Sequence, residues 1–145
     1  MLTRLFATAA CLLTAATGHA QAGAGAVQTY EANTGNTPDG ISRLEITPVG
    51  AGLFAVDLRI VAPNRTHHTG HIQGLARGEG AHLVLRVANF EPDGKVYAPH
   101  PVCTLVIDAD DTRANVVSED TCAGFGGAAA SFAEQGRNLL RTRGE

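Results

Sequence analysis

The chain has little positive charge and no cluster of it. Lys95 is its only lysine, and fourteen Asp and Glu residues outnumber eleven Lys and Arg residues, for a formal net charge of −3. Proteins that bind nucleic acid or anionic membranes carry grouped cationic side chains. The composition therefore argues against nucleic acid and against a membrane surface as partners.

Long apolar runs are also scarce, and the one present lies at the N-terminus. Arg4 precedes the apolar run 5–16, and two small-x-small sites follow it. A run of about a dozen residues is too short to cross a bilayer, and this order of features is typical of a secretory signal peptide. We expect residues 1–22 to be a signal peptide cleaved after residue 20 or 22. Residues 23–145 then form a single β domain with a net charge of −4 and no membrane insertion.

The chain also contains few cysteines. Cys11 belongs to the expected signal peptide, which leaves Cys103 and Cys122, and the chain lacks the Cys-x-x-Cys pair of redox proteins. Two cysteines in an oxidising compartment indicate one disulfide; the alternative is two buried free thiols. The excess of Arg over Lys, with many Ala and Gly residues, suggests a GC-rich bacterial genome. We therefore expect a periplasmic or secreted protein.

Short stretches of alternating apolar and polar residues fill most of the remaining chain. The clearest covers 54–60, and others lie at 27–31, 43–47, 71–77, 82–87, 103–107 and 113–116. Strand-sized runs separated by Gly- and Pro-containing turns predict an all-β fold. We expect an antiparallel up-and-down barrel, or a strongly curved sheet, of seven or eight strands. The tail predicts either a helical turn at 128–135 or a closing strand at 137–143, and the need to hide sheet edges favours the strand.

Three histidines, His67, His68 and His71, fall within five residues. Imidazoles bind Zn, Cu or Ni, and a transition metal is the one cofactor that the sequence suggests. In an extended strand His67 and His71 would lie about 13 Å apart, so one metal could reach both only across a tight turn. The cluster therefore predicts either a metal site or a polar turn with exposed imidazoles that titrate near neutral pH.

Motifs of catalysis are lacking, and we expect the chain not to be an enzyme. None of its serines after the signal lies in a Gly-x-Ser-x-Gly turn. The glycine-rich stretch Gly124, Phe125, Gly126 and Gly127 has no following Lys-Ser/Thr pair for phosphate. Because this stretch follows Cys122, Phe125 is either the exposed tip of an anchored partner-binding loop or a side chain packed under that loop.

Several segments of the second half carry a resemblance to a known family. Residues 103–108 (CTLVID), 114–122 (ANVVSEDTC) and 126–132 (GGAAASF) resemble the end of small secreted bacterial β-barrel proteins similar to periplasmic lysozyme inhibitors. The segment 69–76 resembles their middle strand. Related chains often carry a second disulfide where this chain has His68, or a neighbour, and Ala130. The resemblance implies a barrel, an exported location and a protein partner such as a cell-wall hydrolase.

Two functional hypotheses follow from the sequence. The leading one is an exported periplasmic binding protein, in its most specific form an inhibitor of a lysozyme-like cell-wall hydrolase, with residues 124–127 as the contact loop. The alternative is a periplasmic barrel that binds a small ligand at its mouth or a transition metal at the histidine cluster.

Overall fold

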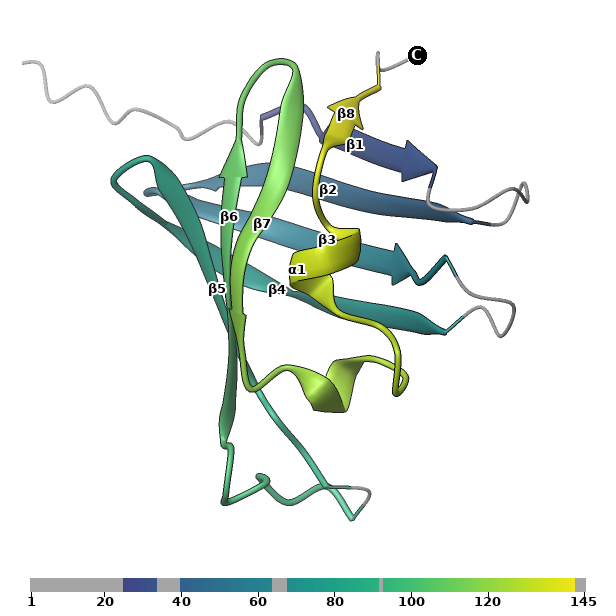
Figure 1. The fold of residues 1–145 in the computed structure, drawn as a ribbon. Coiled ribbons are helices and arrows are strands. Elements are labelled where there is room, and N and C mark those ends of the chain that lie inside the picture. Colours follow the sequence, from purple (N-terminus) through teal and green to yellow (C-terminus); the bar gives the residue numbers. More distant parts are fainter. Residues whose placement is uncertain (1–24, 34–39, 64–67, 92, 143–145) are drawn as a thin grey trace, which may run out of the picture.

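The structure is a computed structural model that describes residues 25–33, 40–63, 68–91 and 93–142, so the expected signal peptide lies outside the described residues. Eight antiparallel strands follow one another in chain order around a closed barrel, as Figure 1 shows. This confirms the predicted antiparallel barrel. The strands are β1 (Gln28–Asn33), β2 (Ile41–Gly50), β3 (Leu53–Val61), β4 (Thr69–Glu79), β5 (His82–Ala88), β6 (Val102–Ala109), β7 (Arg113–Asp120) and β8 (Leu139–Arg141).

The period-two pattern of the sequence decides which side chains fill the barrel. Leu44 of β2 pairs with Leu58 of β3, and Leu58 pairs with Ile72 of β4, so that one buried row crosses three strands. Their neighbours Arg43 and Arg59 are exposed on the outer face. Because successive residues of a strand point to opposite faces, this alternation places an apolar core inside and charge outside.

The barrel wall is incomplete between β4 and β5. These strands pair only next to their hairpin, residues 76–79 with residues 82–85. Away from the hairpin, the earlier part of β4, back to Thr69, pairs only with β3. The later part of β5, as far as Ala88, pairs only with β6. The two strands therefore diverge, as Figure 1 shows.

Residues 122–130, here named the closing segment, bond to the free side of β4 near its start. Gly126 forms an antiparallel bridge with Gly70, and the Gly127 N–H donates to the Thr69 carbonyl at 3.0 Å. A Cβ on Gly70 would lie only 2.9 Å from Ile60 Cγ1, so the strand has a glycine where the barrel interior leaves little room for a side chain. The closing segment therefore lies along β4 where β5 no longer pairs with that strand.

One disulfide attaches the closing segment to the barrel. Cys103 of β6 is bonded to Cys122, 19 residues later in the sequence and two residues after the end of β7. Both cysteines are buried. The predicted pairing is therefore confirmed.

The C-terminal part of the described chain contains both predicted elements. The 3-10 turn η1 (Ala123–Phe125) lies within the closing segment, and a single helical turn, α1 (Phe132–Gln135), follows it. The Ser131 Oγ caps α1 by accepting from the Glu134 N–H at 3.2 Å. After Gly136 the chain turns into β8, which pairs with β1 on one side and β7 on the other. In the described part of the chain, no helix is long and apolar enough to cross a membrane.

Candidate functional site

The structure separates two members of the predicted histidine cluster, and the third, His67, lies outside the described residues. His71 faces outward from β4, with Nε2 3.0 Å from Asp57 Oδ1 on β3. His68 lies against the closing segment, because a Cβ on Gly127 would come within 2.8 Å of its Nδ1. Among the described residues no group of three or more His, Cys, Asp or Glu side chains is placed to hold a metal ion.

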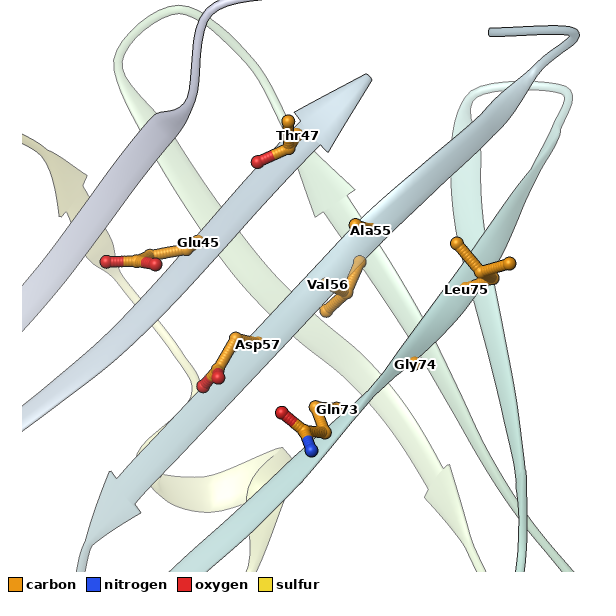
Figure 2. A pocket seen from close by; sticks show the side chains of 8 residues that line it. All are labelled: Glu45, Thr47, Ala55, Val56, Asp57, Gln73, Gly74 and Leu75. Atoms are coloured by element: carbon orange, nitrogen blue, oxygen red, sulfur yellow. The ribbon is translucent and has the colours of Figure 1, made fainter. Parts of the chain in front are cut away.

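A shallow hollow of about 520 Å³ covers the outer face of β2, β3 and β4. Figure 2 shows the residues that line it, which are Glu45, Thr47, Ala55, Val56, Asp57, Gln73, Gly74 and Leu75. Glu45 and Asp57 are directly opposite each other on neighbouring strands. Arg43 lies 2.8 Å from Glu45, and His71 lies 3.0 Å from Asp57. Both carboxylates are thus paired on their own sheet face, and exposed pairs of this kind contribute little free energy.

A second hollow lies at one end of the barrel, between the β5–β6 connection and the start of the closing segment. Its volume is about 610 Å³. We name it the end cleft; it is lined by Asn89, Phe90, Glu91, Tyr97, His100, Thr121, Ala123 and Gly124. The β5–β6 connection projects beyond the strands at the lower end of the molecule in Figure 1. The volume falls in the range of about 300–1,000 Å³ that is typical of ligand sites.

The wall formed by the β5–β6 connection exposes apolar side chains. Phe90 is 63% exposed and Tyr97 is 40% exposed. The Tyr97 ring lies 5.9 Å from the His100 ring, measured between centroids. Phe90 also forms an antiparallel bridge with Val96, which is itself exposed. The connection is therefore an ordered support for an apolar surface.

Asn89 joins the two walls of the end cleft. Its side-chain Nδ2 donates to the His100 carbonyl at 2.7 Å and to the Thr121 carbonyl at 2.8 Å. Both amide hydrogens are then used, and the side chain is held in one orientation. The residue is 5% exposed, and its Oδ1 is buried with no hydrogen-bond partner among the described residues. A buried acceptor without a partner costs about 1–3 kcal/mol.

The four residues of the predicted contact loop have different environments. Gly124 is exposed and lines the end cleft. Phe125 is half-buried and packs against the core, which is the second of the two arrangements considered for it. Gly126 and Gly127 bond to β4. Within this loop only Gly124 remains a candidate for direct contact in the cleft.

Sequence reasoning missed the other wall of the end cleft. The available signal is that Phe90 and Tyr97, two of only seven Phe and Tyr residues in the chain, flank the turn at 92–94. Aromatic side chains beside a polar turn are candidates for binding, because the turn keeps them near solvent.

The pKa shifts of three groups have structural causes outside the end cleft. Burial raises the pKa of the Tyr30 hydroxyl. A hydrogen bond from the Lys95 side chain lowers the pKa of the Asp93 carboxyl. Hydrogen bonds from Thr112 and Arg113 lower the pKa of Asp110 to about 2. These shifts reflect structural contacts of turns and core, and none belongs to a residue of the cleft.

Comparisons with protein-family models, with curated proteins and with solved structures find no match for this chain.

Proposed function

We propose that this chain is an exported binding protein without catalytic activity, and that its end cleft receives a lysozyme-like cell-wall hydrolase, which it inhibits. The observation that carries the proposal is the grouping of exposed apolar side chains beside the cleft. Of ten large hydrophobic side chains found exposed in the described ranges, four lie between residues 90 and 102 (Phe90, Val96, Tyr97 and Val102), and Phe90 and Tyr97 line the cleft. Grouped apolar side chains at a concave surface are characteristic of protein-binding sites.

Three features of the chain support this class of partner. The Cys103–Cys122 disulfide suits an oxidising compartment, where cell-wall hydrolases act. The resemblance of residues 103–108, 114–122 and 126–132 to exported hydrolase inhibitors covers most of β6 and β7 and parts of the closing segment, and it includes Thr121 of the cleft wall. The net charge of −4 after the expected signal peptide would speed association with a basic hydrolase.

Inhibition requires no reacting group from this chain. A barrel end that seats on the hydrolase beside its substrate groove excludes the cell-wall strand by occupying the same space. The end cleft suits this role because the disulfide fixes the start of one wall and Asn89 connects that wall to the other. A surface that is ordered before binding loses less conformational entropy on association.

The test is capture of lysozyme-like hydrolases from a purified panel, together with inhibition of cell-wall lysis. Phe90→Ser should weaken a positive interaction about thirtyfold, since a central aromatic contact contributes about 2 kcal/mol. Leu75→Ser is the matched control, because Leu75 is 59% exposed but lies in the outer hollow. Equal effects of the two substitutions, or no hydrolase bound at micromolar concentration, would contradict the proposal.

A further inference from the structure

The end cleft contains an acceptor that the described residues leave unsatisfied. Asn89 cannot rotate its amide to use this oxygen, because the carbonyls of His100 and Thr121 both need N–H donors. Gly124 lies next to the acceptor: a Cβ built on it would lie 3.6 Å from Asn89 Oδ1 and would meet no other neighbouring atom within 4 Å. The buried oxygen is therefore next to an exposed glycine, and both residues line the cleft.

We infer that the end cleft binds an aromatic side chain of the protein partner that carries a single N–H donor, of the indole type, with the N–H directed to Asn89 Oδ1. The inference rests on the proposed function, because the side chain belongs to the partner. Phe90 and Tyr97 provide aromatic surface for its ring. Because Oδ1 is buried beside Gly124, the inference includes an outward movement of Gly124 that lets the donor reach this oxygen.

The chemistry of the cleft selects a neutral donor over a charged one. Asn89 Oδ1 is an uncharged acceptor, and a buried ammonium or guanidinium needs a carboxylate or several acceptors to offset its desolvation. Glu91 lines the cleft but is exposed. An indole has one donor and no acceptor, whereas a phenol also buries oxygen lone pairs that need donors. The indole is therefore the group whose burial satisfies Asn89 without leaving another polar atom unpaired.

The test compares indole with 1-methylindole, which has the same ring system without the donor. Titration of the exported chain is followed by ¹H–¹⁵N NMR. Indole should shift the Gly124 backbone amide and the Asn89 side-chain amide, and it should bind about five- to tenfold more tightly than 1-methylindole, as expected for one hydrogen bond to a buried acceptor.

Substitution of Gly124 tests the same hydrogen bond by changing the protein instead of the probe. Gly124→Ala places a methyl group over Oδ1, and Gly124 is not among the glycines with positive φ, so alanine fits its backbone. This variant should bind both probes equally. Gly78→Ala on β4 is the matched control, because its Cβ would also have its nearest neighbours at 3.6 Å, and it should keep the preference for indole.

Equal affinities of the two probes for the unsubstituted chain would overturn the inference, as would shifts that omit Asn89 and Gly124, or tighter binding of butylammonium. The two proposals can fail separately. If a hydrolase is captured and Phe90→Ser weakens its binding, but indole is not preferred over 1-methylindole, only this inference is wrong. If indole is clearly preferred but no hydrolase is captured, the proposed hydrolase partner is wrong, whereas the hydrogen bond from an indole N–H to Asn89 is supported.

Discussion

Removal of the disulfide measures how strongly the closing segment depends on its covalent attachment. In the Cys103→Ala/Cys122→Ala variant, the unfolded chain gains the entropy of an open loop with a sequence separation of 19. For a loop of this size the entropy corresponds to about 3 kcal/mol, and the two lost sulfur atoms add a small cavity cost, because the cysteines are 0% and 5% exposed. We expect the free energy of unfolding to fall by about 3–4 kcal/mol and the Tm to fall by roughly 10 °C.

Urea unfolding followed by circular dichroism gives the first measurement, and the reduced unsubstituted chain is the control that should match the variant. Hydrogen exchange gives a local measurement. The Gly127 amide, bonded to the Thr69 carbonyl at 3.0 Å, should lose more protection than the amides of β2 and β3. A loss of less than about 1 kcal/mol with full protection of Gly127 would refute the reasoning, since the closing segment would then be held by its contacts with β4 alone.

Three further predictions concern packing and pH. Gly70→Ala should lower the free energy of unfolding by about 1–3 kcal/mol in urea titrations, because its Cβ would crowd Ile60, whereas a neutral result would mean that Ile60 moves freely. Phe125→Ala should cost about 2 kcal/mol, while the exposed Phe90→Ser should change stability by less than about 0.5 kcal/mol; similar losses would contradict the core placement of Phe125. The lowered pKa of Asp110 stabilises the fold above about pH 4, and this contribution disappears as the pH falls through about 2. Asp110→Asn should therefore be less stable at pH 5, by a difference that shrinks toward pH 2 in acid unfolding; a constant difference would contradict this.

The strands were predictable because most of them have a buried face and a more exposed face. In β3, for example, Val56, Leu58 and Ile60 are buried and alternate with residues that are less buried. The closing segment was not predictable, because it depends on Gly70 meeting Gly126 across a divergence of two strands that no local pattern encodes. Local periodicity reports on the faces of a strand and contains no information on where neighbouring strands separate.

The candidate site was predicted only in part for the same reason. Gly124 was identified from the glycine-rich stretch after Cys122, but Asn89 and the β5–β6 connection were not. The role of Asn89 comes from two carbonyl groups 11 and 32 residues away in sequence, those of His100 and Thr121. A single Asn after a strand has the same local appearance as any polar residue that enters a turn.

The shortness of β8 has a consequence for how the chain is made and handled. Its three residues pair with β7 on one side and with β1 on the other, and Tyr30 lies opposite Arg141 although more than a hundred residues separate them in the sequence. A product truncated before Leu139 would keep the outer edges of β1 and β7 unsatisfied, and such edges recruit strands from other molecules. Early termination or C-terminal trimming should therefore yield aggregates, and an affinity tag belongs beyond residue 142 on a spacer that leaves β8 free to pair.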